Sequence, residues 1–142
     1  MKTGDGGACV FCGVVSGLIP ASMVLEEDAV VAFLDHRPVF KGHTLVVPRS
    51  HVATLPDLPT ELFEPVFGVV QRVARALGDA LGAHGSFVAV NNVVSQAVPH
   101  LHVHVVPRKR KDGLRGFFWP RERYCDDAER EQIAAALRAH LG

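Results

Sequence analysis

The segment that most constrains the fold is residues 99–107, where histidine alternates with aliphatic residues between two prolines. Side chains along a β-strand point to opposite faces in turn, so this pattern predicts a strand with two different faces. One face carries His100, His102 and His104, and the other carries three aliphatic side chains. We therefore expect a strand whose apolar face packs in a core while its histidines are available for chemistry.

Three chemical uses of these histidines are compatible with the sequence. The first is one metal ion bound by all three, but His100 and His104 lie ~13 Å apart along a strand, too far to share a tetrahedral ion without bending. The second is a split role, in which one histidine completes a distant metal site and another does chemistry. The third is a nucleophile or proton relay, in which a neutral imidazole attacks an electrophile.

The rest of the chain predicts strands, a helix, further strands and a second helix. Short apolar runs bounded by charge or proline predict strands, in residues 24–35 (a pair with a charged turn), 43–48, 86–91 and 100–106. Apolar residues at helical spacing predict a long helix over residues 61–81 and an amphipathic C-terminal helix over residues 126–141. Thr60 or Asp57 is the expected cap of the long helix. This order predicts an α+β fold with a mainly antiparallel sheet.

Length and charge limit the function classes. The 142 residues have the size of one domain, so residues 1–142 are expected to fold as one. The 15 Lys and Arg residues are balanced by 15 Asp and Glu residues, which argues against a polycation that neutralises nucleic-acid phosphates. No apolar run approaches the ~20 residues that a transmembrane helix needs. The first residues lack the pattern of a signal peptide, so we expect a cytoplasmic protein with no membrane partner.

The cysteines predict a metal site more readily than disulfides, because the expected compartment is reducing and one of the three is left over. Cys9 and Cys12 form a C-x-x-C pair, which occurs in zinc sites, in redox dithiols and without a role, and Cys125 stands alone. With His51 and one strand histidine, the pair would make a Cys₂His₂ tetrahedron typical of structural zinc. Such a site would pin the N-terminal segment and the loop after Val47 to the histidine strand, and orient the backbone beside the next histidine.

A basic and aromatic segment separates the last predicted strand from the C-terminal helix. Its members are Arg108, Lys109, Arg110, Lys111, Arg115, Phe117, Phe118, Trp119, Arg121 and Arg123. A solvated loop with an aromatic anchor explains this composition, and so does a basic rim for an anionic ligand or a subunit contact. A nucleic-acid face has little support, because no recognisable binding motif accompanies the charge.

The histidine strand resembles the signature of the histidine triad (HIT) superfamily, His-φ-His-φ-His-φ-φ with φ apolar, here residues 100–106. The similarity extends to further motifs upstream of this strand. They are Cys9-Val-Phe-Cys12, Ile19-Pro20-Ala21, Glu26-Glu27-Asp28, Ala32-Phe33-Leu34-Asp35, Gly42-His43-Thr44-Leu45-Val46-Val47-Pro48, His51, Asn91 and Gln96. The resemblance covers roughly residues 8–111 and leaves most of the C-terminal part, residues 112–142, outside.

The resemblance implies a nucleotide-binding protein, commonly a homodimer, that acts as a hydrolase or transferase at the α-phosphate of a nucleotide. A nucleoside phosphoramidate or a dinucleoside polyphosphate would be the substrate, and no organic cofactor is implied. His102, the middle histidine, would be the nucleophile that carries a covalent nucleotidyl group, assisted by His104 and Gln96. The implied ligands of a structural Zn²⁺ are Cys9, Cys12, His51 and His100. The implied nucleotide-binding residues are Phe33 near the base, Asp35 on the ribose, and Asn91, Gln96 and His104 around the phosphates.

Two departures from the family pattern bear on the substrate. A serine commonly follows the glutamine in the phosphoramidate-hydrolysing branch, whereas Ala97 follows Gln96 here, which puts an amine leaving group in question. The loop over residues 91–96 is also shorter than the glycine-containing loop of many members. Of the remaining histidines, His43 is expected to be structural and His36 to line the nucleoside pocket.

Two other functions are compatible with the same residues. One is a zinc-structured nucleotide-binding module with a binding or regulatory role and little turnover. The other is a catalytic zinc hydrolase with an open metal position. Substitution of a zinc-binding cysteine separates structural from catalytic zinc, because a structural metal affects stability more than chemistry.

Overall fold

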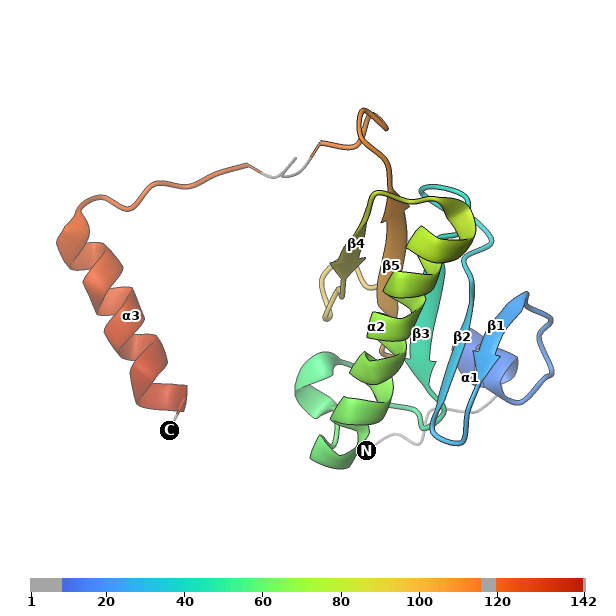
Figure 1. The fold of residues 1–142 in the computed structure, drawn as a ribbon. Helices are drawn as coiled ribbons and strands as arrows, with labels where there is room; N and C mark the ends of the chain where they lie inside the picture. Colours follow the sequence, from blue (N-terminus) through green and yellow to red (C-terminus); the bar gives the residue numbers. More distant parts are fainter. Residues whose placement is uncertain (1–8, 116–119, 142) are drawn as a thin grey trace. The chain divides into compact units, whose positions relative to one another are not determined.

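The computed structural model describes residues 9–115 and 120–141. Its centre is a five-stranded antiparallel sheet in the order β1-β2-β3-β5-β4 (Figure 1). The strands are β1 (Met23–Glu26), β2 (Val30–Leu34), β3 (Thr44–Pro48), β4 (Gly85–Ala89) and β5 (Val103–Arg108). The helices are α1 (Val10–Val15), the short 3₁₀ helix η1 (Leu55–Asp57), α2 (Thr60–Leu81) and α3 (Asp127–Leu141). The predicted α+β class with a mainly antiparallel sheet is confirmed.

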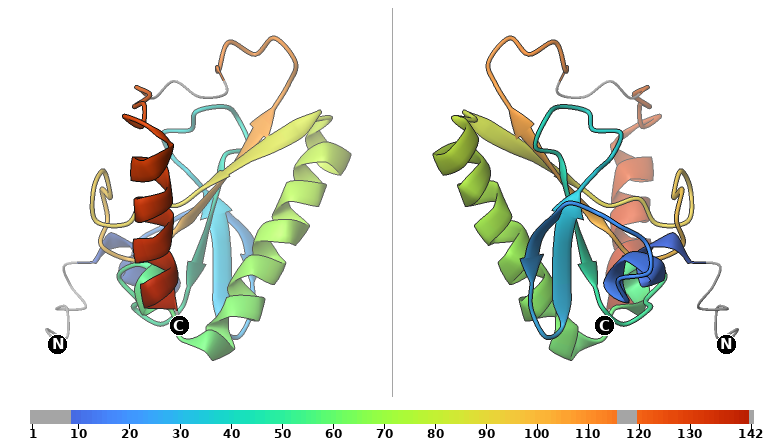
Figure 2. Two further views of the ribbon diagram at one scale, coloured as in Figure 1. Left: turned by 90° about the vertical axis from the view of Figure 1, so that its left-hand side faces the viewer. Right: turned by 90° about the vertical axis from the view of Figure 1, so that its right-hand side faces the viewer.

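The sheet is covered on one face by α2 and on the other by α1, as both views of Figure 2 show. The core on the α2 face consists of Val30, Ala32, Val46, Val66, Val69, Val70, Val73, Leu77, Val103 and Val105. The smaller core on the α1 face consists of Cys9, Phe11, Val14, Val31, Phe33, Leu45 and Val47. Because β2 and β3 contribute residues to both cores, they are apolar almost throughout, unlike a strand with one wet face.

The histidine strand is shorter than predicted at its start. β5 begins at Val103, because the backbone N–H of Leu101 donates to the carbonyl of Val52 in the loop after β3, 2.6 Å away, instead of joining the ladder. The alternation of side chains continues through this segment. Leu101 and Val103 are fully buried, each worth about 1.5–3 kcal/mol of hydrophobic stabilisation.

Helix α2 occupies the predicted span, but neither predicted residue caps it. Pro59 is at the N-cap position and makes no side-chain cap hydrogen bond. The carboxylate of Asp57 accepts a hydrogen bond from the hydroxyl of Thr54, 2.6 Å away, so it is committed to η1 instead. At the other end Gly82 adopts a φ of 69°, the left-handed conformation that favours glycine after a helix.

The chain divides into two compact units, Met1–Asp112 and Gly113–Gly142. The first contains the sheet, α1 and α2. The second contains α3, in which no described residue is buried and Ile133, Leu137 and Leu141 form an exposed apolar stripe. Of the basic and aromatic segment, the residues Phe117, Phe118 and Trp119 lie outside the described residues. No helix in the described parts of the chain is long and apolar enough to cross a membrane.

Candidate functional site

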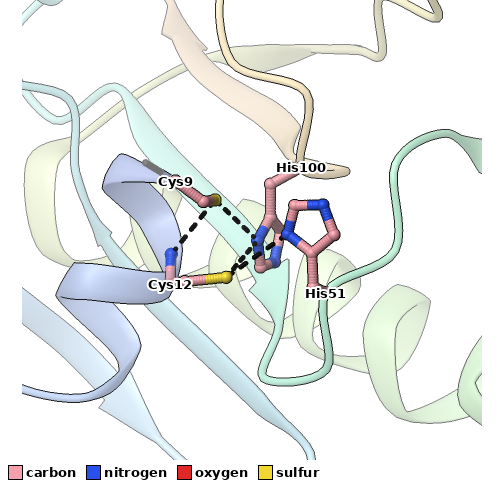
Figure 3. A group of neighbouring side chains, drawn as sticks. All are labelled: Cys9, Cys12, His51 and His100. Carbon is pink, nitrogen blue, oxygen red and sulfur yellow. Dashed lines mark hydrogen bonds between the residues drawn. The ribbon is translucent and has the colours of Figure 1, made fainter. Parts of the chain in front are cut away.

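Two cysteines and two histidines from distant parts of the chain converge at the start of α1 (Figure 3). Sγ of Cys9 lies 3.4 Å from Nδ1 of His100, and Sγ of Cys12 lies 3.6 Å from the same atom. Sγ of Cys12 also lies 3.3 Å from Nδ1 of His51. All four potential ligand atoms lie within 4.8 Å of one another. The predicted Cys₂His₂ set, with His100 as the strand histidine, is thus assembled in one place.

These distances fit a tetrahedral zinc ion. With Zn–S near 2.3 Å and Zn–N near 2.05 Å, neighbouring sulfur and nitrogen ligands of a tetrahedron lie about 3.6 Å apart. The ring of His100 is oriented for this role, because its Nε2–H donates to the carbonyl of Pro48, 2.9 Å away, and leaves the lone pair of Nδ1 toward the thiols. Burial lowers the pKa of His100, which favours the neutral imidazole that binds metals.

The protonation of the thiols is the property of this group that a bound cation would change most. Burial, followed by the hydrogen bond and charge of Cys9, raises the pKa of Cys12 to about 11. A coordinating thiol is deprotonated outright by Zn²⁺, which reverses this effect. Sγ of Cys9 also accepts the backbone N–H of Cys12 at 3.3 Å and so caps α1. The two cysteines therefore hold both the cluster and the short helix.

His102 has the tautomer that a nucleophilic imidazole needs. Its Nδ1–H donates to the carbonyl oxygen of His100, 2.8 Å away, so Nε2 carries the lone pair. Its ring is nearly buried and contacts the rings of Phe11 and His104, both with centroids 4.9 Å away.

His104 belongs to a hydrogen-bonded chain that also sets its tautomer. Nδ1 of His43 accepts the backbone N–H of Val39 at 3.1 Å, so the proton of His43 is on Nε2. That proton is donated to Nδ1 of His104, 2.9 Å away, which places the proton of His104 on its own Nε2. Burial, then the charges of His102 and His43, lowers the pKa of His104 to about 4. At neutral pH His104 is therefore an uncharged hydrogen-bond donor.

Asp35, His43 and His104 form a second group with metal-ligand chemistry. The carboxylate of Asp35 lies 3.7 Å from Nε2 of His43. Because Nε2 of His43 carries a proton, it has no lone pair to give a metal ion. We therefore assign this group to the hydrogen-bonded chain and not to a metal site.

A cleft of about 910 Å³ opens beside His102 and His104 on the α1 face of the sheet. Most of its lining is apolar, and the side chains include Val10, Phe11, Val14, Ile19, Phe33, Leu45 and Val98. Asp35 and His36 also line it. Whether this cleft is the predicted nucleoside pocket stays a prediction. Ala97 also lines it and offers no hydroxyl. An apolar cleft with a few polar groups at one end is the usual form of a small-molecule site.

Asn91 and Gln96 are not among the residues that line this cleft. Oε1 of Gln96 accepts the backbone N–H of Val93 at 3.0 Å, and its Nε2 donates to the carbonyl of Ala53 at 2.7 Å. Gln96 thus ties its own loop to the segment after β3. Val93 and Ser95 in this loop have φ values of 68° and 61°, in the left-handed region that favours glycine. The phosphate roles of Asn91 and Gln96 stay predictions.

Two contributors to the site were not predicted. Phe11 lies between the two cysteines, and its ring contacts His102, but nothing in the C-x-x-C spacing indicates where that ring points. His43 was expected to be structural, and it is buried; its hydrogen bond to His104 in addition makes it part of the site. Both contributions depend on how α1 and the end of the β2–β3 loop pack, which single-strand periodicity does not specify.

The sequence and the fold have clear relatives. Residues 16–111 match the family model described as the HIT domain. The chain is 31% identical over 140 residues to an adenylylsulfatase of Arabidopsis thaliana, covering 94% of this chain and 69% of that protein. It is 34% identical over 115 residues to an adenosine 5'-monophosphoramidase of Schizosaccharomyces pombe, covering 80% of this chain and 84% of that protein.

Crystal structures of related proteins share the architecture. A HIT family protein of Bacillus subtilis superposes with a TM-score of 0.84 at 35% identity, covering 95% of this chain and 98% of that chain. A zinc-bound histidine triad family protein of Mycobacterium smegmatis superposes with a TM-score of 0.74 at 36% identity, covering 92% and 99%. The residue pattern, the sheet and these matches agree, and the chain belongs to the HIT domain family.

Proposed function

We propose that this protein cleaves a nucleotide at its α-phosphate through a covalent nucleotidyl-His102 intermediate, as a hydrolase or a nucleotidyl transferase. The observation that carries the proposal is the hydrogen bond from Nδ1 of His102 to the carbonyl of His100, which leaves the lone pair on Nε2 beside the cleft. A neutral imidazole with its other nitrogen held in this way is an activated nucleophile.

In the first step, the lone pair of Nε2 forms a bond to the α-phosphorus as the bond to the leaving group breaks. The leaving group takes the bonding electrons, and the positive charge that develops on the imidazole is stabilised by the carbonyl of His100. In the second step, water attacks the phosphorus, the bonding pair returns to Nε2, and the surplus proton of the water passes to solvent. An acceptor other than water would make the same intermediate a transferase.

His104 is proposed to stabilise charge on the phosphate oxygens. The two hydrogen bonds that link Val39 to His43 and His43 to His104 leave a proton on Nε2 of His104, so this nitrogen can donate a hydrogen bond. A donor held in place before the reaction is worth most where charge develops in the transition state. Phe33 and Asp35, which line the same cleft, are proposed to bind the base and the ribose. Gln96 and Asn91 are proposed to reach the phosphates, which requires their loop to move from the arrangement described above.

Cys9, Cys12, His51 and His100 are proposed to bind a structural Zn²⁺. When bound, the ion would supply a rigid cross-link between α1, the loop after β3 and the start of the histidine segment. A tetrahedron filled by four protein ligands leaves no open position, which favours a structural over a catalytic metal. A zinc-bound HIT relative is consistent with this assignment.

The two enzyme relatives suggest the substrate class. One is named for hydrolysis of adenylyl sulfate and the other for hydrolysis of adenosine phosphoramidate. We propose that this protein acts on a nucleoside phosphoramidate, a dinucleoside polyphosphate or adenylyl sulfate. A cytoplasmic homodimer is also proposed. In support of the dimer, β4 is an edge strand, and Phe63, Leu81 and Val88 are exposed apolar side chains on α2 and β4.

The test is turnover of adenosine phosphoramidate, adenylyl sulfate and diadenosine polyphosphates by the zinc-loaded protein. His102→Asn is expected to abolish turnover and the nucleotidylated peptide seen by mass spectrometry. His140→Asn, which changes an exposed histidine of α3, is the matched control and should behave as the wild type. Equal turnover by His102→Asn would refute the mechanism. Tight nucleotide binding with negligible turnover by the wild type would instead favour a zinc-structured binding module.

A further inference from the structure

Phe11 stands between the proposed nucleophile and the four proposed zinc ligands Cys9, Cys12, His51 and His100, which are called the metal cluster below. It is the residue between Cys9 and Cys12 that faces inward, and its side chain is 8% exposed. Its ring centroid lies 4.9 Å from that of His102 with an interplanar angle of 80°, and 6.1 Å from that of His100 at 74°. It also contacts Phe33, 5.4 Å away at 68°. One aromatic ring therefore contacts the proposed nucleophile, a proposed zinc ligand and the proposed base site.

We propose that Phe11 is a positioning residue that holds the imidazole of His102 in its attacking orientation, and that the C-x-x-C motif serves catalysis through this ring. The proposal rests on the proposed function of His102. Phe11 itself takes no part in the bonds that form or break.

The hydrogen bond to His100 does not by itself fix the ring of His102. One hydrogen bond at Nδ1 sets the tautomer and anchors one atom, but the ring can still tilt about that anchor. An edge-to-face contact with a neighbouring ring blocks this tilt, because such pairs have a preferred angle and separation. In-line attack on phosphorus tolerates little tilt, since a misplacement of about 1 Å can cost on the order of 10²-fold in rate.

The position of Phe11 depends in turn on the two cysteines. α1 has six residues, and a helix this short is not stable by itself in water. Cys9 caps its first turn through the 3.3 Å hydrogen bond to the N–H of Cys12, and the thiol of Cys12 faces His51 and His100. Both neighbours of the Val10-Phe11 pair are thus anchored in the metal cluster. The backbone that carries the ring of Phe11 is therefore held by these contacts on both sides.

The experiment compares Phe11→Ala and Phe11→Leu with the wild type and with Val15→Ala. Leucine keeps most of the apolar volume but has no aromatic ring. Val15 is the matched control, because it also packs α1 against the core but does not line the cleft. Four quantities are measured on the zinc-loaded full-length chain: zinc per chain, the dissociation constant of AMP, the single-turnover rate with adenylyl sulfate, and solvent exchange of the Nδ1–H of His102 by ¹⁵N-edited NMR.

We expect Phe11→Ala to lower the single-turnover rate by about 10- to 100-fold, with Phe11→Leu in between. Zinc content should stay at the wild-type value, and AMP affinity should change much less than the rate. The Nδ1–H of His102 should exchange faster in both variants, while Val15→Ala should match the wild type in all four measurements.

An unchanged rate and unchanged proton exchange in Phe11→Ala would overturn the proposal. A fall in rate that is matched by an equal loss of AMP affinity would also overturn it, because Phe11 would then be a binding residue. A fall in rate that occurs only together with loss of zinc in both variants would overturn it as well. If the wild type itself does not turn over the substrate, the proposed function fails. The proton exchange of His102 would then still decide whether Phe11 positions its ring.

Discussion

The free energy of unfolding is expected to depend on pH through His104. Burial is the largest cause that lowers its pKa, the charges of His102 and His43 add to it, and Asp35 opposes it. The pKa in the folded protein is about 4, whereas an unperturbed histidine has a pKa of ~6.5. Between these values the unfolded chain takes up a proton at this position and the folded protein does not. The folded state therefore loses stability as the pH falls from about 6.5 toward 4.

The size of this loss follows from the two pKa values. With 4 for the folded state and 6.5 for the unfolded state, the loss attributable to His104 is close to zero at pH 7.5, about 1.4 kcal/mol at pH 5.5 and about 2.6 kcal/mol at pH 4.5. Part of the ring of His104 is in contact with solvent, which screens the charges, so these are upper values. The slope approaches 1.4 kcal/mol per pH unit within the window.

The assay is urea unfolding followed by circular dichroism, at pH 7.5 and pH 5.5 with zinc in excess. His104→Asn removes the titrating group, and its amide oxygen can still accept the Nε2–H of His43. Protonation of the metal cluster affects both proteins alike, so it cancels in the difference between them. We expect the wild type to lose about 1 kcal/mol more than the variant between these pH values. Parallel losses in the two proteins would refute the reasoning.

Two further predictions concern the groups on either side of His102. Removal of zinc by a chelator is expected to lower the melting temperature by several degrees and to be reversed by zinc, because a ligand of the folded state stabilises it. Cys12→Ser should reproduce the loss and Cys125→Ser should not, and equal effects of the two would contradict the cluster. His43→Phe is expected to cost about 1–3 kcal/mol of unfolding free energy, because it leaves the N–H of Val39 and Nδ1 of His104 without this partner. An unchanged urea midpoint would contradict that prediction.

The fold was predictable where periodicity decides it. The apolar positions of α2 and the alternation around β5 each specify a buried face, and both elements form close to where the pattern placed them. α1 was missed, because its sequence, VFCGVV, contains a glycine and is too short to show a helical period. Its stability comes from the cap by Cys9 and from packing on the sheet, which are contacts between distant segments. The predicted strand over residues 100–106 began too early for a similar reason. The N–H of Leu101 donates to a loop carbonyl, so the ladder of β5 starts only at Val103.

The site was predictable where residue type and spacing carry the chemistry. A C-x-x-C pair, a separate histidine and an alternating histidine strand predicted a Cys₂His₂ set that includes one strand histidine, and the family resemblance implied that this histidine is His100. The hydrogen-bonded chain that sets the tautomer of His104 was not predictable, because it begins at a backbone N–H, that of Val39. The register of β3 against β5 pairs Leu45 with His104 and so brings His43 within reach, and register is a property of the sheet.

His100 joins the metal cluster to the proposed nucleophile by two different groups. Its ring offers Nδ1 to the cysteines, and its backbone carbonyl accepts the Nδ1–H of His102. A ligand that fixes the ring also restricts the backbone of the same residue, and so the direction of that carbonyl. The alternation of a strand makes this coupling possible, because it places the next histidine two residues along on the same face. With Phe11 at the ring of His102, the cluster contacts the proposed nucleophile both at its hydrogen-bonded atom and at its ring. A structural metal bound by these four residues would therefore affect the rate without taking part in the chemistry.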